Sequence, residues 1–363
     1  MKTPSITRKT NGIRHFTLLL AALVLICIVL SVAVISSSRR IARQDRILDS
    51  IPLRNDYRSM TAGSISGGMR QVTFFDDSTV FYITGNTLVL RCLSDSSPLL
   101  EFLGHSGDIQ DYEVSPDRRR VVTSSQDGTL RLWDTHSGEC LACSRQLDTL
   151  AQPASAMLHD IVLCSGGRRL MSADMEGVKT WRTSDLKLLS SEGSSLYHEG
   201  CGQLSPDRKT LCSPIPEISE GFKVFARKKG RYELLDSVKD RTPLCYSDDG
   251  RRLLVTSKVT GGMEIWDTDP KTMRSGRSLL WFNIPKASLG AAALSKDGKR
   301  LVSVHGDGTV RIWSARSGAE REVLHYDGQE MDGVCFSPNG AMVMAYNSQT
   351  GVYCLWGPFS WII

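Results

Sequence analysis

The residues that could do metal or acid–base chemistry are few and poorly spaced for it. His198-Glu199 begins like the His-Glu-x-x-His zinc motif, but Gly202 stands where the second histidine belongs. His198 with Cys201 and Cys212 makes a conceivable metal set, for which no fourth ligand is evident. The sequence holds no Gly-x-Ser-x-Gly elbow and no phosphate-binding Gly-x-x-x-x-Gly-Lys loop. We therefore expect no catalytic residue, no bound metal and no cofactor.

The chain has ten cysteines, and nine of them follow the apolar run that holds Cys27. Cys140 and Cys143 form a Cys-x-x-Cys, and residues three apart on a regular strand point to opposite faces, so we expect no disulfide between them. Nine is an odd number, so a complete disulfide framework would leave one thiol over. The interpretation we favour is that the cysteines are buried small hydrophobes, because most stand in apolar, strand-like contexts: Cys92, Cys164, Cys245, Cys335 and Cys354.

The net charge of +5 is concentrated near the N-terminus. Up to Arg58 there are ten Lys/Arg and three Asp/Glu, which gives +7 and leaves 5 − 7 = −2 for the rest of the chain. A nearly neutral domain lacks the electrostatic signature of nucleic-acid binding.

The N-terminal region predicts a membrane anchor. A basic tail, residues 1–15, precedes Phe16–Ile35, which is 20 residues without a charge. At ~1.5 Å per residue a helix of that length crosses the ~30 Å hydrocarbon core, so we expect a single retained transmembrane helix. A cleaved signal peptide is the alternative, with Ser36-Ser37-Ser38 as its cleavage site. Residues 36–56 would form a juxtamembrane linker.

The sequence determines only weakly on which side of the membrane the C-terminal domain lies. Arginines follow the apolar span about as often as basic residues precede it, so the positive-inside rule is close to a tie. A short N-terminal tail ahead of a lone anchor favours export of the bulk, which places the C-terminal domain on the extracytoplasmic side. The many unpaired cysteines argue weakly the other way.

From Gln71 onward the chain is organised in repeated units. Thr129–Trp133 and Thr309–Trp313 match almost residue for residue, and each follows Asp-Gly. Looser copies of this β-prone segment place one anchor residue in each unit, at spacings of 41 to 48 residues: Arg91, Trp133, Trp181, Phe225, Trp266, Trp313 and Trp356. A turn rich in Ser, Pro, Asp and Gly, such as Ser115-Pro116-Asp117, recurs seven times as well.

The stretch from Gly104 to Asp134, which opens with Gly-His and closes with Trp-Asp, resembles one unit of a WD-repeat β-propeller. The resemblance covers residues 57–363 and implies an all-β ring of seven four-stranded antiparallel blades. The last unit ends soon after Trp356 and lacks an outer strand, which the segment 57–66 would supply to close the ring. Units three and four, between residues 141 and 235, are degenerate.

The resemblance also implies a structural hydrogen-bonded tetrad: His105, Asp127 and Trp133 with Thr123 or Ser125. Such a set satisfies buried polar groups and stabilises a blade, without catalysis. Strand alternation leaves Thr123 and Ser125 both open as the hydroxyl donor.

The two faces of a propeller would have different functions. We expect partner-binding residues in loops of the top face: Asp108, Gln126, Glu176, Lys258, His305 and Asn347. The first hairpin turns would project from the opposite, bottom face and are basic, which favours contact with lipid headgroups: Arg118, Arg119, Arg120, Arg168, Arg169, Arg208, Lys209, Arg251, Arg252, Lys299 and Arg300. These turns are also typical of the solvated surface of an ordinary propeller.

Taken together, these features favour a non-enzymatic, membrane-anchored scaffold, a monomeric propeller that binds protein partners through its loops and binds no nucleic acid. One alternative is a hydrolase with an active site built from channel loops. It would need convergent carboxylates, histidines or a metal, which the sequence does not show. The other is a guanine-nucleotide exchange factor similar to the membrane-anchored WD-repeat factors of vesicle budding, although those carry their anchor after the propeller.

Overall fold

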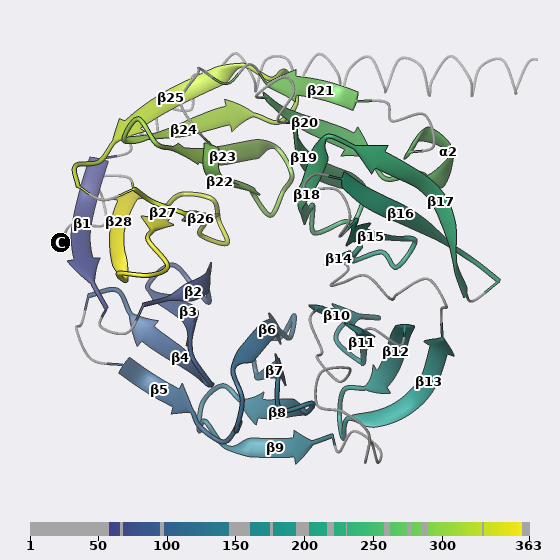
Figure 1. The fold of residues 1–363 in the computed structure, drawn as a ribbon. Helices are drawn as coiled ribbons and strands as arrows, with labels where there is room; N and C mark the ends of the chain where they lie inside the picture. The colour runs from purple at the N-terminus through teal and green to yellow at the C-terminus, as the bar shows by residue number, and fades with distance from the viewer. Residues whose placement is uncertain are drawn as a thin grey trace, which may run out of the picture. The chain divides into compact units, whose positions relative to one another are not determined.

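A computed structural model describes residues 58–65, 68–94, 98–144, 160–174, 177–193, 203–215, 221–229, 231–257, 262–273, 278–282, 284, 289–328 and 330–357. The described residues form seven four-stranded antiparallel sheets, arranged as the blades of a ring (Figure 1). The all-β, seven-bladed propeller predicted by the recurring third strands is therefore confirmed.

The first three blades run in sequence order from the innermost to the outermost strand. Blade one contains β2 (Arg70–Phe74), β3 (Thr79–Thr84), β4 (Thr87–Cys92) and β5 (Pro98–Phe102). Blade two contains β6 (Ile109–Val114), β7 (Arg120–Ser125), β8 (Leu130–Asp134) and β9 (Cys140–Cys143). Blade three contains β10 (Asp160–Cys164), β11 (Arg169–Asp174), β12 (Gly177–Arg182) and β13 (Lys187–Gly193).

The next three blades follow the same order. Blade four contains β14 (Gln203–Leu204), β15 (Thr210–Pro214), β16 (Gly221–Lys228) and β17 (Arg231–Lys239). Blade five contains β18 (Arg241–Tyr246), β19 (Arg252–Ser257), β20 (Gly262–Asp267) and β21 (Ser278–Phe282), with the short helix α2 (Pro270–Met273) before β21. Blade six contains β22 (Leu289–Leu294), β23 (Arg300–His305), β24 (Thr309–Ser314) and β25 (Glu320–His325).

The seventh blade joins the two ends of the ring. It contains β26 (Gly333–Phe336), β27 (Val343–Tyr346) and β28 (Val352–Gly357), and its outer strand is β1 (Arg58–Ser64) from the start of the domain. The pairing of β1 with β28 is antiparallel, with Ala62 opposite Cys354. This is the closure that the missing final strand predicts, and it pairs a sheet edge that would otherwise be exposed.

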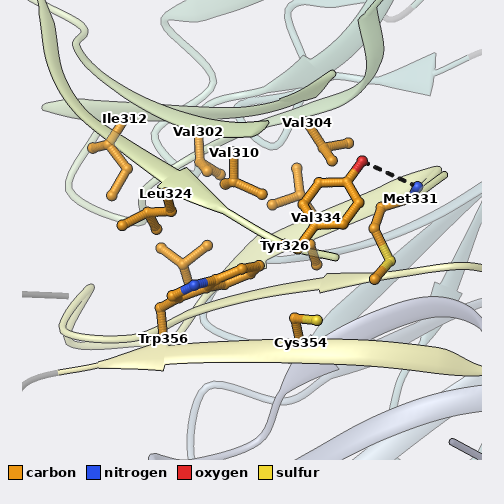
Figure 2. Packing of buried hydrophobic residues seen from close by; sticks show 12 residues of the cluster. Val302, Val304, Val310, Ile312, Leu324, Tyr326, Met331, Val334, Cys354 and Trp356 are labelled. Carbon is orange, nitrogen blue, oxygen red and sulfur yellow. Dashed lines mark hydrogen bonds between the residues drawn. The ribbon is translucent and has the colours of Figure 1, made fainter. Parts of the chain in front are cut away.

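The hydrophobic core is distributed between neighbouring blades, because each sheet is apolar on both faces. Figure 2 shows the contact of blades six and seven, where Val310 and Ile312 of β24 lie with Trp356 of β28 in one buried cluster. All six aromatic anchor residues are at most 4% exposed: Trp133, Trp181, Phe225, Trp266, Trp313 and Trp356. Blade one departs from this pattern, since Arg91 takes the place of the aromatic ring and is partly exposed.

A β-bulge recurs where the outer strand of each blade pairs with the third strand. In blade two Ala142 lies opposite Leu132 and Cys140 lies opposite Trp133, so Leu141 is the extra residue. A bulge of this kind shifts the alternation of the side chains that follow it. The expectation that Cys140 and Cys143 face opposite sides was wrong, because it assumed a regular strand.

The predicted anchor at residues 16–35, with its flanking tail and linker, lies outside the described residues. Within the described part of the chain, no helix is long and apolar enough to cross a membrane.

Candidate functional site

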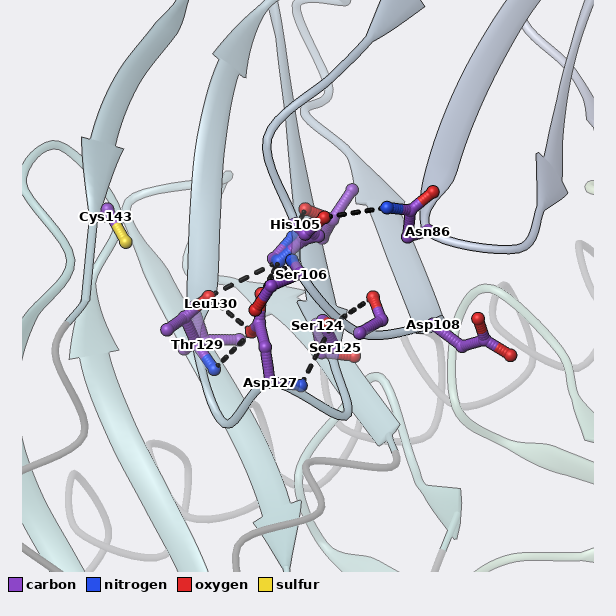
Figure 3. A network of polar contacts seen from close by, with 12 residues as sticks. Asn86, His105, Ser106, Asp108, Ser124, Ser125, Asp127, Thr129, Leu130 and Cys143 are labelled. Carbon is purple, nitrogen blue, oxygen red and sulfur yellow. Dashed lines mark hydrogen bonds and ion pairs between the residues drawn. The ribbon is translucent and has the colours of Figure 1, made fainter. Parts of the chain in front are cut away.

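The predicted tetrad forms a continuous hydrogen-bonded chain in blade two, and Figure 3 shows its His105 and Asp127 end. His105 Nδ1 lies 2.8 Å from Asp127 Oδ2, and His105 Nε2 lies 2.7 Å from Thr123 Oγ1. The indole Nε1 of Trp133 donates to the same hydroxyl at 2.9 Å. His105, Thr123 and Trp133 are all at most 3% exposed.

The structure assigns the two hydroxyls that the sequence left open. Thr123 joins the histidine to the tryptophan, whereas Ser125 Oγ donates to the carbonyl of Gly107 at 2.7 Å and holds the loop before β6. Sequence reasoning missed Thr129, whose hydroxyl donates to Asp127 Oδ1 at 2.6 Å. The signal was present, because Asp-Gly-Thr occurs before both β8 and β24.

The protonation of this tetrad suits a structural role. Burial lowers the pKa of His105, and the neighbouring Asp127 offsets this only in part. Burial on its own would raise the pKa of Asp127, but hydrogen bonds from Thr129, His105 and the Ser106 amide lower it to about 2. A charged aspartate thus holds the histidine in one orientation.

Blade six contains a rearranged version of the tetrad. His305 comes from the end of β23, at the position that corresponds to Ser125, and its Nε2 lies 2.8 Å from Ser303 Oγ. Trp313 Nε1 donates to the same hydroxyl at 2.8 Å. The prediction that His305 is an exposed partner-binding residue was wrong, since its side chain is 0% exposed. Burial, with repulsion from Arg311, lowers the pKa of His305 to about 4.

Blade five replaces the hydroxyl with a carboxylate. Trp266 Nε1 donates to Glu264 Oε2 at 2.7 Å, and Arg241 forms an ion pair with Glu264 Oε1 at 3.1 Å. The guanidinium also lies 5.7 Å from the Trp266 ring centroid. Glu264 is only 4% exposed, so this ion pair is largely shielded from solvent.

The inner strands enclose a cavity of about 430 Å³ that collects carboxyl groups of three blades. Asp111, Glu113, Asp160 and Asp248 line it, together with Gln203. Sequence reasoning missed this set, because the carboxyl groups are spread over some 140 residues and only ring closure brings them together.

Asp111 and Asp160 form the central pair of this cavity. Asp111 Oδ2 accepts from the Ile161 amide at 2.8 Å, and Asp160 Oδ2 accepts from the Leu204 amide at 2.7 Å, so each carboxyl group links its blade to the next. Burial raises the pKa of Asp111 to about 6. Burial and repulsion by Asp111 raise the pKa of Asp160 well above its usual range, and the two side chains share a hydrogen bond. This pair therefore retains a proton in conditions where isolated aspartates lose theirs.

Glu113 differs from this pair, because no hydrogen bond or ion pair engages its carboxylate within the described residues. Burial raises its pKa well above the usual range, with added repulsion from Asp111, Asp160 and Asp248. A second cavity of about 410 Å³ continues toward the first hairpin turns and is lined by Asp248, Lys296 and Arg118.

The remaining predicted loop residues vary in their surroundings. Asp108 and Gln126 are exposed and adjacent, since the Gln126 amide donates to the Asp108 carbonyl at 2.9 Å. Asn347 is half-buried, and its side chain donates to the Glu330 carbonyl at 2.6 Å. Glu176 and Lys258 lie outside the described residues.

The basic turn residues divide into two groups. Arg208, Arg252 and Arg300 are half-buried, whereas the other eight are exposed: Arg118, Arg119, Arg120, Arg168, Arg169, Lys209, Arg251 and Lys299. Arg252 bonds the carbonyls of Gly298 and Ala315 in the next blade, and the Arg300 guanidinium lies 5.4 Å from the Phe336 ring centroid. These two side chains connect neighbouring blades, which the charge pattern alone did not predict.

Within the described part of the chain, no group of three or more His, Cys, Asp or Glu side chains is placed to hold a metal ion. His198 and Cys201 lie outside the described residues. Cys212 is buried, and its thiol lies 3.0 Å from the Tyr246 hydroxyl.

Comparison with known proteins agrees with this geometry. Residues 96–134 and 285–314 match the family described as "WD domain, G-beta repeat". The first segment contains the tetrad of blade two, and the second contains Ser303, His305 and Trp313 of blade six. The chain is thus a seven-bladed β-propeller in which two segments match WD40 repeats.

Its similarity to individual proteins is distant. The chain is 26% identical to "Serine-threonine kinase receptor-associated protein" of Dictyostelium discoideum, over 75% of this chain and 90% of that protein. It is 21% identical to "Transcription initiation factor TFIID subunit 5" of Caenorhabditis elegans, over 61% of this chain but only 32% of the relative's length. The β-propeller domain of Cps50 (Swd1) from Myceliophteria thermophila superimposes with a TM-score of 0.61 at 15% identity, covering 83% of this chain and 99% of that one.

Proposed function

We propose that this protein is a non-enzymatic, membrane-anchored scaffold whose propeller binds a protein partner at the top face and at the carboxylate-lined mouth of its channel. The observation that carries the proposal is Glu113, a carboxyl group in a cavity of about 430 Å³ without a partner in the described residues. Glu113 is half-buried, and desolvation and the neighbouring carboxyl groups disfavour its charged form, so a cation in the cavity would stabilise that form.

The partner surface would combine this cavity with the loops at its rim. Asp108 immediately precedes the inner strand β6, which carries Asp111 and Glu113 farther along. Gln126 lies beside Asp108, so an exposed polar pair stands where β6 begins. A partner segment that places a lysine or arginine in the cavity would bury its charge against Glu113 and contact Asp108 and Gln126 outside. Rigid blades hold these groups in place before binding, which reduces the entropy lost on association.

The anchor and the orientation extend this proposal. Phe16–Ile35 would hold the protein in the membrane, with the propeller on the extracytoplasmic side, and the exposed basic turns of the bottom face would meet anionic headgroups. The top face would then point away from the lipid. Relatives whose names refer to complexes, such as "Target of rapamycin complex subunit wat1", are compatible with a scaffold role.

Site-directed photocrosslinking tests the proposal. A photoreactive amino acid at Gln126 on the top face is compared with one at Lys209, which is 63% exposed on a first hairpin turn. In native membranes we expect a discrete adduct from position 126 alone, which weakens when Glu113→Gln removes the carboxylate. Equal adducts from both positions, or an adduct that ignores Glu113→Gln, would contradict the proposal.

A further inference from the structure

We propose that Cys140 and Cys143 form a two-thiolate site for a soft, thiophilic metal ion of the Cu(I) class on the outer edge of blade two. The site is separate from the channel and from the proposed partner surface. It follows from the register of β9, the exposure of both thiols and the charge beside them.

The bulge at Leu141 brings the two thiols to one face of the sheet. Cys143 lies opposite Arg131, and Cys140 lies opposite Trp133. Residues paired across antiparallel strands share a face, and Arg131 and Trp133 share one because they are two apart on β8. Both cysteines therefore stand on that same face.

Both thiols are also accessible. β9 is the outermost strand of its blade, and Cys140 and Cys143 are exposed and free. Figure 3 shows Cys143 on its outer strand, apart from the His105 network. Cys164, Cys212 and Cys354 are buried instead. Among the described cysteines, Cys140 and Cys143 are thus the two exposed thiols, and both can meet a solvated ion.

The spacing favours a bridging ion over a disulfide. Same-face neighbours on a strand are separated by two steps of ~3.3 Å, or ~6.6 Å, whereas the Cβ atoms of a disulfide approach to about 3.5–4.5 Å. Metal–sulfur bonds of about 2.3 Å on both sides of an ion fill the remaining gap.

The identity of the ion follows from the number of ligands and from charge. Zn²⁺ prefers four protein ligands in structural sites, but no third metal-ligating side chain joins the two cysteines among the described residues. Thiolates select soft ions, and Cu(I) is stable with two of them. A bis-thiolate complex of a monovalent ion carries one negative charge. Arg131, the cross-strand neighbour of Cys143, supplies a guanidinium whose Nε has no hydrogen-bond partner in the described structure.

Anaerobic titration of the full-length chain with Cu(I), buffered by a chromophoric Cu(I) chelator, tests the site. Alkylation and mass spectrometry then map which cysteines the ion protects. We expect Cu(I) to protect Cys140 and Cys143 together, and each of Cys140→Ser and Cys143→Ser to weaken binding at this site at least tenfold. Cys92→Ser is the matched control, because it removes a partly exposed thiol from another blade and should leave the protection unchanged.

Two further variants separate the geometry from the mere presence of thiols. Deleting Leu141 removes the bulge but leaves Cys140 and Cys143 two residues apart on a regular strand, so both thiols stay on one face and should keep the joint protection. Cys143→Ser with Ala142→Cys keeps two thiols but moves one to the opposite face, so this variant should lose the joint protection. Loss of protection in the folded deletion variant, retained joint protection in the folded double variant, or an unchanged affinity in a single serine variant would overturn the proposal.

Discussion

Trp266 Nε1 donates a 2.7 Å hydrogen bond to Glu264 Oε2, so blade five fixes its tryptophan with a charged carboxylate. Blades two, three and six use a hydroxyl for the same purpose, from Thr123, Ser172 and Ser303. The carboxylate is tolerated because Arg241 pairs with its other oxygen. In these four blades the indole thus finds an acceptor, but not always from the same kind of side chain.

Removing the acceptor in blade five should be strongly destabilising. Glu264→Ala leaves the Trp266 indole and the Arg241 guanidinium without their partner, and breaking a buried pair in this way costs about 3–5 kcal/mol, although the partial exposure of Arg241 reduces the value. Thermal unfolding should show a melting temperature lowered by several degrees. Glu264→Gln keeps an acceptor for the indole and is the control, with a smaller loss. Equal losses in the two variants would mean that the hydrogen bond contributes little.

Variants of the tetrad in blade two should lower the free energy of unfolding by graded amounts. Trp133→Ala removes a side chain that is 1% exposed and should lower the free energy of unfolding by about 3–5 kcal/mol. Thr123→Val keeps the shape but leaves two donors or acceptors unsatisfied, which costs about 1–3 kcal/mol. Denaturant titration should rank the two variants in that order. Ser125→Ala, which affects only the bond to the Gly107 carbonyl, should cost less than either. A Trp133→Ala protein with an unchanged transition would place the indole outside the core.

The fold was predictable because its signals are local and repeated. The Asp-Gly turn, the alternating third strand and the terminal tryptophan lie within a few residues of each other, so two strong units such as Thr129–Trp133 and Thr309–Trp313 set the period for the weaker ones. The bulge at Leu141 has no comparable signal, because it depends on pairing with β8. For the same reason the sequence predicted opposite faces for Cys140 and Cys143.

The stability of blade six should depend on pH through His305. Its pKa is lowered to about 4, whereas an unfolded histidine titrates near ~6.5. Between these pH values the unfolded chain binds more protons than the folded protein. The stability that the neutral His305 contributes is therefore fully present above about pH 6.5 and is lost as the pH falls toward 4. The loss is at most about 3 kcal/mol, and solvent screening reduces it. Urea unfolding at several pH values should give a shallower pH dependence for His305→Gln than for the unaltered protein. Parallel profiles would show that His305 titrates normally.

The carboxyl pair of the channel should have the opposite effect on the pH dependence of the free energy of unfolding. Because the pKa of Asp111 is raised to about 6, the folded state holds a proton that the unfolded chain releases near ~4, and this contribution is lost as the pH rises through 6. Asp111→Asn keeps an oxygen for the Ile161 amide and removes the titration, so it should stabilise the propeller by about 1–3 kcal/mol near pH 8. Melting curves of both proteins across this range provide the measurement. Asp108→Asn, on the exposed rim, is the control and should leave the profile unchanged.

The candidate site was less predictable than the fold, since its groups meet only in the closed ring. Asp111, Asp160 and Asp248 belong to three blades, and nothing in their local sequence marks them as neighbours. His305 was misplaced for a related reason. In the sequence it stands just before Gly306-Asp307-Gly308, as a loop residue would, but it is the last residue of β23 and its ring bonds Ser303, whose hydroxyl also accepts from Trp313.

On the bottom face, different arginines should affect lipid binding and the stability of the propeller. Arg118, Arg119 and Arg251 are exposed, whereas Arg252 is half-buried against carbonyls of the next blade. If the exposed group meets anionic headgroups, each side chain adds roughly 1 kcal/mol close to the surface, and the effect falls off within a Debye length of ~10 Å. We therefore expect a fragment of residues 51–363 to bind liposomes more strongly as their anionic lipid content rises, and more weakly as salt is added.

Replacing Arg118, Arg119 and Arg251 by Ser should reduce this binding and leave the melting temperature nearly unchanged. Arg252→Ser should do the reverse, because it removes inter-blade hydrogen bonds rather than a free charge. If the fragment ignores anionic liposomes even at low salt, the basic turns serve only to keep that face of the ring solvated.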